Sequence, residues 1–171
     1  MRLRRWVSVM ILIGLVVVCS FAFAQPRQTL EVEATSWIVS SQGLPVGDEA
    51  GHSIGIQKRE GSAVFRDGQT AQYSTVSNFD FRRGRGGTSS GYSKFTFDDG
   101  STLIFSWTAA ITVGADGLSL NKGKGTIIQG TGKFASIKGT SVFSGRQLKP
   151  AAEDPKGTAV QQATIQYTLT K

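Results

Sequence analysis

The sequence is poor in the residues from which most catalytic and metal sites are built. Its 171 residues include one histidine, His52, and one cysteine, Cys19. A single histidine excludes a multi-histidine metal site, and a single thiol excludes a disulfide within the chain. We find no complete catalytic or metal-binding constellation, so we expect no metal and no cofactor. His52 itself is interpreted as an ordinary loop or strand residue, with pairing to Asp48 or Ser53 as the alternative.

Long apolar runs are also missing, except at the start of the chain. Three arginines among the first five residues precede an apolar stretch, residues 6–23, that ends in Ala22-Phe23-Ala24. A basic start, a short apolar segment and an A-x-A ending are typical of a secretory signal peptide. We expect residues 1–24 to be cleaved, which predicts an exported protein, periplasmic or extracellular, with no stable membrane insertion afterwards. An uncleaved anchor is the alternative, since about 18 apolar residues can just span a bilayer.

Once this segment is removed, the chain carries only a mild excess of positive charge. The formal charge falls from +7 to +4, because 16 Lys and Arg then face 12 Asp and Glu. This balance suits adhesion to anionic envelope components and is far from that of a nucleic-acid-binding domain. Arg82-Arg83-Gly84-Arg85 is followed by two glycines and is similar to segments that grip single-stranded nucleic acid. In an exported protein we interpret it as a solvated loop, and we expect no nucleic-acid partner.

The rest of the chain alternates between strand patterns and glycine-rich turns. Period-two alternation is clearest in Gln69–Arg82 and Thr102–Val113, and Asp67-Gly68 predicts a tight hairpin. Further strands are predicted at Thr29–Ser40, His52–Gln57, Ser62–Arg66, Tyr92–Phe97, Gly125–Gln129, Gly139–Leu148 and Thr158–Thr170. Helical periodicity is absent after the first segment, which predicts an all-β sandwich or barrel. We expect a disordered lead at residues 25–28 and one domain at residues 29–171.

One segment carries a family resemblance. Residues 130–139 read G-T-G-K-F-A-S-I-K-G, which resembles the G-T-G-x-F-x-x-I/A-x-G motif of the allene oxide cyclase and dirigent-like barrels. In those families the motif forms a turn between two late strands of a barrel. The resemblance implies a single eight-stranded antiparallel β-barrel and, on this ground alone, a homo-oligomer, a trimer. It transfers no catalytic residue, because the acids and tyrosines of those families lie in stretches that do not align here.

We expect the same segment to be a structural corner. Phe134 and Ile137, three residues apart, can both face the core only if the chain forms one turn of α- or 3₁₀-helix between strands. Gly132 permits the tight reversal, and Lys133 and Lys138 are then expected to point to solvent.

The acidic residues offer two kinds of candidate site. Glu31 and Glu33 share one face of the first strand with Trp37. If that face points inward, two buried carboxylates form a site; if it points outward, they are solvated. The pairs Asp48-Glu49 and Asp98-Asp99 lie in turn sequences, where Asp is favoured for local hydrogen bonds, and a general acid–base pair or a calcium loop is the alternative.

The aromatic residues give the other site candidates. Tyr73, Phe105 and Trp107 belong to a set that would line the interior of a barrel. Eight-stranded barrels either fill their interior with such side chains or hold one small ligand. With Glu31, Glu33 and Trp37, these three residues complete the candidate ligand-binding set.

Three classes of function stay open. The first is an exported barrel that binds a small apolar ligand or serves a structural envelope role. The second, an isomerase or cyclase similar to allene oxide cyclase acting in an apolar pocket, rests on the resemblance alone. The third is a surface-interaction protein that uses the basic loop Arg82–Arg85. Carboxylates inside an open barrel would favour the enzyme. An open pocket without acidic residues would favour the binding protein, and a filled interior would favour the surface-interaction protein.

Overall fold

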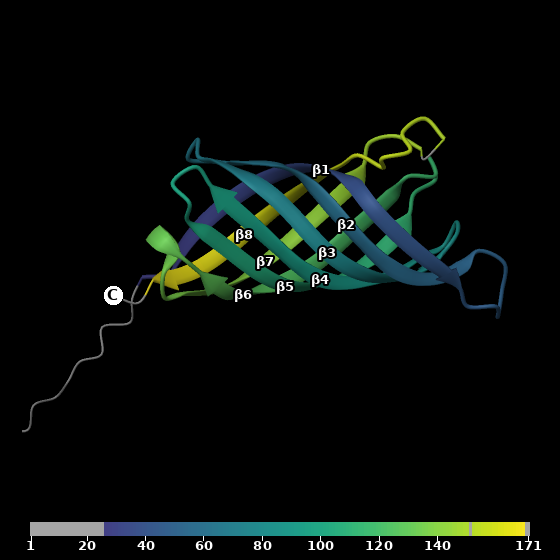
Figure 1. Ribbon diagram of the computed structural model, residues 1–171, viewed down its shortest axis with the longest axis horizontal. Helices are drawn as coiled ribbons and strands as arrows, with labels where there is room; N and C mark the ends of the chain where they lie inside the picture. The colour runs from purple at the N-terminus through teal and green to yellow at the C-terminus, as the bar shows by residue number, and fades with distance from the viewer. Residues whose placement is uncertain (1–25, 151, 170–171) are drawn as a thin grey trace, which may run out of the picture.

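Eight antiparallel strands close into one barrel. The computed structural model describes residues 26–150 and 152–169. Each strand pairs with the next along the chain, and β8 pairs with β1 to close the barrel (Figure 1). The strands are β1 Gln28–Pro45, β2 His52–Phe65, β3 Thr70–Arg82, β4 Gly86–Phe97, β5 Thr102–Val113, β6 Ser119–Gly130, β7 Ile137–Gln147 and β8 Ala159–Leu169. The predicted all-β barrel is confirmed, whereas the expected signal peptide lies outside the described residues. Within those residues, no helix is long and apolar enough to cross a membrane.

The largest difference between the predicted and the observed strands is in β2. Two short strands were predicted where the structure has one continuous strand, His52–Phe65. The prediction was wrong at the charged run 58–60 and at Gly61, which interrupt the apolar alternation. Pairing with β3 continues through this run without interruption, and pairing with β1 resumes across a register shift between Ile38 and Ser40. The first strand also extends beyond the predicted end at Ser40, since β1 continues to Pro45.

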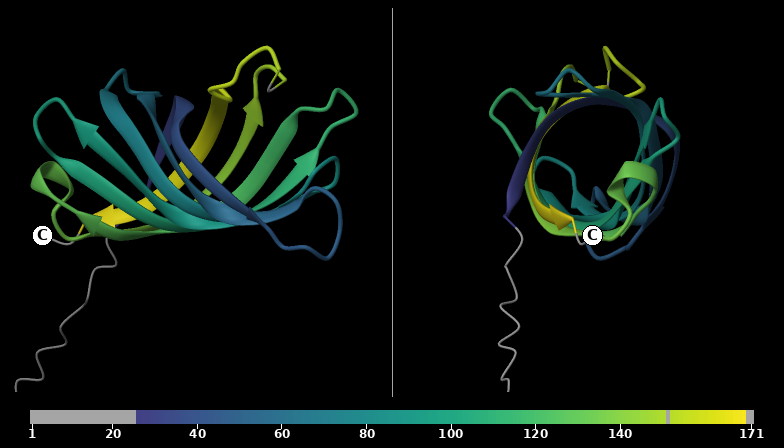
Figure 2. Two further views of the ribbon diagram at one scale, coloured as in Figure 1. Left: turned by 45° about the vertical axis from the view of Figure 1, so that its right-hand side comes forward. Right: turned by 90° about the vertical axis from the view of Figure 1, so that its left-hand side faces the viewer.

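The two ends of the barrel differ in how they are closed. At one end lie the β2–β3 and β4–β5 turns and a short 3₁₀-helix, η1 (Gly132–Phe134). Figure 2 shows η1 lying at the rim of this end. The other end carries the β1–β2, β3–β4, β5–β6 and β7–β8 connections (Figure 1). We call these the plugged end and the loop end.

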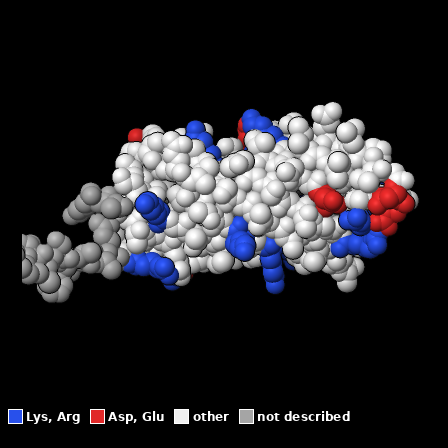
Figure 3. Space-filling model, turned by 90° about the horizontal axis from the view of Figure 1, so that it is seen from below, with Lys and Arg blue, Asp and Glu red and all other residues white. Residues whose placement is uncertain are grey.

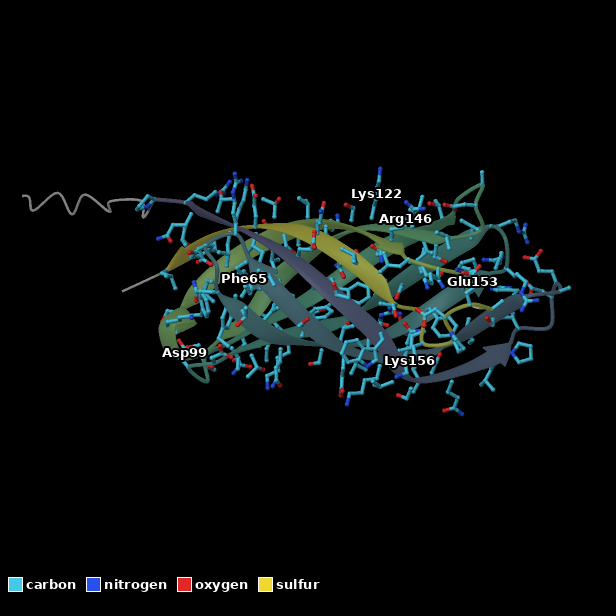
Figure 4. The ribbon with its side chains drawn as sticks, turned by 90° about the horizontal axis from the view of Figure 1, so that it is seen from above. Phe65, Asp99, Lys122, Arg146, Glu153 and Lys156 are labelled. Carbon is cyan, nitrogen blue, oxygen red and sulfur yellow. The ribbon has the colours of Figure 1, made fainter. Side chains whose placement is uncertain are left out.

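Large apolar side chains fill the half of the interior next to the plugged end. Phe65, Leu103 and Ile165 are 2%, 0% and 1% exposed. The Phe65 ring lies 5.5 Å from that of Phe95 and 5.0 Å from that of Phe97, measured between ring centroids. Figure 4 shows Phe65 inside this half of the barrel. Ring pairs of this kind add stability beyond the area they bury, so this half is a packed hydrophobic core.

The corner predicted at residues 130–139 completes that core. The 3₁₀ turn is confirmed, and Phe134 and Ile137 are both buried. Gly132 adopts φ +59°, and a Cβ there would lie 2.3 Å from Ser101 Oγ. Lys138 is exposed as expected. Lys133 is exposed too, and its ammonium lies 3.2 Å from Asp99 and 4.4 Å from the centroid of the Phe97 ring.

Candidate functional site

The half of the interior next to the loop end is open. It holds a cavity of about 430 Å³, within the range of small-molecule sites. All eight strands and the end of the β7–β8 loop contribute to its wall. Its lining includes the side chains of Arg59, Tyr73, Thr75, Trp107, Asn121 and Phe143.

Small inward-facing residues make this space. Side chains alternate between the two faces of a strand, and in this half several inward positions hold a small residue, among them Ser36, Ser53, Ser77, Ser89 and Ser119. Two of the glycines are covered by aromatic rings: a Cβ at Gly55 would lie 2.5 Å from the Phe79 ring, and one at Gly123 would lie 2.3 Å from the Phe143 ring. The tips of the two rings therefore occupy the space that a side chain at either glycine would take.

Tyr73 forms the floor between the two halves. It is buried, packs on Phe95 at 5.1 Å between centroids, and also lines the cavity. Its hydroxyl lies 3.2 Å from Ser93 Oγ and donates to Gln161 Oε1 at 3.4 Å. Burial raises the pKa of this phenol, so Tyr73 is a neutral hydrogen-bonding group at the bottom of the cavity.

Three polar atoms of the cavity wall have no partner within the described structure. They are Thr75 Oγ1, Trp107 Nε1 and Asn121 Oδ1. A buried polar group without a hydrogen bond typically costs about 1–3 kcal/mol. One donor and two acceptor-capable atoms on the wall of one cavity are therefore available to a ligand or to water.

Arg59 is the only charged side chain among the described residues that line the cavity. Its Nε donates to Ser36 Oγ at 3.2 Å, and its Nη2 donates to the carbonyls of Ser36 and Gly157 at 3.1 and 2.5 Å. These bonds tie β2 to β1 and to the β7–β8 loop. Burial lowers the pKa of the guanidinium, but an arginine in a protein stays protonated.

The predicted site residues fall into two groups. Tyr73 and Trp107 line the cavity, and Phe105 lies below it, beside a separate void of about 30 Å³. Glu31, Glu33 and Trp37 lie on the outer face, because the inward face of β1 is formed by Val32, Ala34 and Ser36. Glu31 there pairs with Arg66 at 2.7 Å, and Glu33 accepts a hydrogen bond from Gln162 at 3.0 Å.

Sequence reasoning missed Arg59 and Asn121. A signal for Arg59 was present: Ala63 and Phe65 mark the inward phase of β2, and counting back in steps of two places Gly61, Arg59 and Gln57 on the same face. The same count from Ile127 along β6 reaches Asn121. Phase counting from apolar anchors would therefore have found both residues.

A second polar cluster lies outside the barrel wall at the loop end. His52 is buried, with Nδ1 2.6 Å from Asp48 and Nε2 2.9 Å from Asp80. Hydrogen bonds to Asp80 and then to Asp48 raise the pKa of His52. Asp48, Glu49 and His52 together have the donor set of a metal site, but Glu49 is already bonded to Arg82 and Arg85. Figure 3 shows acidic side chains beside basic ones at this end, and we assign the cluster to ion pairing between loops.

This pairing also changes the interpretation of the basic loop. Arg82 belongs to β3 and Gly86 begins β4, so residues 83–85 form a tight turn and not a long solvated loop. Arg82 and Arg85 both donate to Glu49 of the β1–β2 loop. Much of the charge that suggested an interaction surface is therefore neutralised within the chain.

A larger hollow, of about 1210 Å³, lies on the outer face across β1 to β6. Leu44, Ile54 and Ile56 lie at one side of it, and Lys122 and Lys124 at the other. Lys122 points away from the barrel (Figure 4). The hollow is open to solvent, and none of the three unpartnered polar atoms lines it. The interior cavity is therefore the better candidate site despite its smaller volume.

The chain matches no protein-family model and no curated protein sequence.

Proposed function

We propose that this protein binds a small, largely apolar molecule inside the loop-end half of its barrel. The observation that carries the proposal is the combination of a cavity of about 430 Å³ with three unpartnered polar atoms on its wall. A barrel evolved only for stability would gain by filling this space, as it does in the other half, because cavities and unpaired polar groups both destabilise. Binding of a ligand removes both costs.

The cavity favours a binder over a cyclase or isomerase. None of its described lining residues is Asp, Glu or His, so the usual pair of general acid and general base is not assembled there. Tyr73 is a weak acid whose pKa is raised further by burial. The resemblance of residues 130–139 to the allene oxide cyclase and dirigent-like barrels therefore supports a shared architecture and not a shared reaction.

The place of binding follows from the N-terminal segment. The arginines, apolar stretch and A-x-A ending of residues 1–24 support a proposal that the barrel acts outside the cytoplasm. The intact mass of the exported protein is expected to correspond to a chain beginning at Gln25. Full-length chain recovered from the membrane would contradict this part of the proposal.

Two adjacent alanines on β5 test where a ligand sits. Both border the outer hollow, but only Ala109 is buried and lines the interior cavity, whereas Ala110 is exposed. The probe is N-phenyl-1-naphthylamine, a neutral apolar dye whose fluorescence rises when it leaves water. We expect Ala109→Trp to abolish the fluorescence rise by filling the cavity, and Ala110→Trp to leave it unchanged.

The opposite pattern would place the dye on the outer face and contradict the proposal, as would a wild-type protein that does not bind it. Thermal unfolding of both variants shows whether the barrel is intact. Ser77→Phe, which fills the cavity from β3, repeats the test from another wall.

A further inference from the structure

We propose that the ligand is an aromatic monocarboxylate whose carboxylate is held by Arg59. This inference rests on the proposed function and names the class of molecule that the same cavity takes. It depends on the charge balance of the interior, on the hydrogen bonds that Arg59 leaves open, and on the rings of the wall.

The charge of Arg59 is not balanced inside the barrel. Its described partners are the neutral oxygens of Ser36, Gln57 and Gly157. Among the described residues no carboxylate lies within 4 Å of it. Asp154 of the β7–β8 loop acts on it from beyond that distance, and the Asp154 oxygens accept hydrogen bonds from the backbone of Lys156 and Thr158. The exposed Arg66 and Arg146, in contrast, each pair with an acid at 2.7 and 2.8 Å. A partly buried cation with only neutral partners favours an anion in the space beside it.

The hydrogen bonds of Arg59 leave room for that anion at one nitrogen. A guanidinium has five N–H donors, and four of them are accounted for by Ser36, Gln57 and Gly157. The fifth belongs to Nη1, whose other bond, to Gln57 Oε1, is long at 3.3 Å. A carboxylate can therefore bind at Nη1 and displace the Gln57 amide, while Nε and Nη2 keep the guanidinium fixed against Ser36 and Gly157.

The amount of positive charge argues for a carboxylate rather than a phosphate. One arginine faces the cavity and no lysine does, among the described lining residues. One positive charge balances a monoanion, whereas a phosphate dianion would be left with a buried excess charge.

The wall favours a ring as the body of this molecule. The aromatic side chains Phe79, Phe81, Trp107 and Phe143 all line the cavity, and Trp107 and Phe143 already pack edge to face at 5.9 Å between centroids. Flat apolar ligands gain stacked or edge contacts with such rings. The cavity volume equals that of about 14 liquid waters at about 30 Å³ each, which suits a compact bicyclic body.

A matched pair of probes tests the carboxylate directly. 2-Naphthoate and 2-naphthamide have the same rings, and only the first is charged. Titrated calorimetrically into the full chain, naphthoate is expected to bind about 10- to 100-fold more tightly, as one charge-assisted hydrogen-bonded contact allows. Arg59→Gln should reduce the affinity for naphthoate to that for naphthamide and leave the affinity for naphthamide unchanged. Arg59→Lys should keep a preference for naphthoate, and Arg66→Gln, on the outer face, should change neither.

The outcomes separate this inference from the proposed function. Equal affinity of the two probes for the wild type, or a naphthoate preference that survives Arg59→Gln, would overturn the carboxylate assignment while N-phenyl-1-naphthylamine still binds. Failure of all three probes to bind would overturn the proposed function with it. Because Arg59 anchors the β7–β8 loop, Arg59→Lys provides the answer if the glutamine variant does not fold.

Discussion

The two halves of the barrel interior are built on the same eight strands and have opposite contents. Towards the plugged end, inward positions hold Phe65, Leu103 and Ile165, all at most 2% exposed. Towards the loop end, the same strands present Arg59 and Asn121 around a cavity. The β2–β3 and β4–β5 ladders run through both halves without a register shift. Stability is therefore concentrated in one half, which leaves the other half free to carry polar groups that a packed core would exclude.

The largest expected contrast is between Phe65 and Phe81. Both are inward phenylalanines, but Phe65 is buried in the core and Phe81 lines the cavity. Phe65→Ala should lower the free energy of unfolding by about 3–5 kcal/mol. Phe81→Ala should lower it by about 1 kcal/mol, because its ring is only partly buried. Equal losses in urea denaturation would mean that the two halves do not differ in packing.

The plug should be the next most sensitive feature. Gly132→Val combines a positive φ with a clash against Ser101, so we expect it to lower the free energy of unfolding by about 2–4 kcal/mol. Gly68→Val is the control, because Gly68 also has a positive φ but a Cβ there would meet nothing within 4 Å; its cost should be about 1–2 kcal/mol. Lys133→Ala should be nearly silent, since its ion pair is exposed. Melting curves that rank these variants differently would contradict the assignment of the corner as a structural plug.

A change in the open half should raise stability. Asn121 Oδ1 is buried without a partner, so Asn121→Leu removes an unpaired polar atom while keeping a similar volume. We expect the ligand-free protein to gain about 1 kcal/mol and its affinity for ligand to fall. A loss of stability in urea denaturation would show that Asn121 is satisfied in solution and is not held open for a ligand.

The smallest effect should come from the cluster outside the wall. The raised pKa of His52 means that its contacts with Asp80 and Asp48 stabilise the fold below the ordinary value of 6.5. This contribution is lost as the pH rises from 6.5 through the raised pKa of the folded state. The free energy of unfolding should therefore decline over that interval, and His52→Gln should remove the slope. Because this cluster lies outside the barrel, ligand affinity should not change over this pH interval in the way that stability does. If the free energy of unfolding still declines with pH in His52→Gln, His52 is not the source of that decline.

The fold was more predictable than the site, and one residue shows why. The apolar alternation of Thr102–Val113 matches β5 residue for residue, because hydrophobic periodicity reports a packed inward face. In β2 the charged run 58–60 and Gly61 break that periodicity, which is why two strands were predicted there. Arg59, the charged residue of the open half, belongs to this run and was missed with it.

The remaining errors have a similar origin. Glu31 and Glu33 were candidates because their phase was left open, and it was decided by Val32 and Ala34, which pack inward. The tertiary pairing of Glu49 with Arg82 and Arg85 joins residues more than 30 positions apart. Local sequence patterns carry no information about such contacts, so the basic loop could not be recognised as neutralised.

The most direct test of the account uses two tryptophans, one on each side of the wall. Trp107 lines the cavity with an unpartnered Nε1, and Trp37 is 38% exposed on the outer face. In a ¹H–¹⁵N correlation spectrum, with the Trp37 signal assigned by Trp37→Phe, addition of 2-naphthoate should shift the Trp107 indole resonance and leave that of Trp37 in place. A shift of Trp37 alone, or no shift of Trp107 at saturating ligand, would contradict the claim that the open half of the barrel is the binding site.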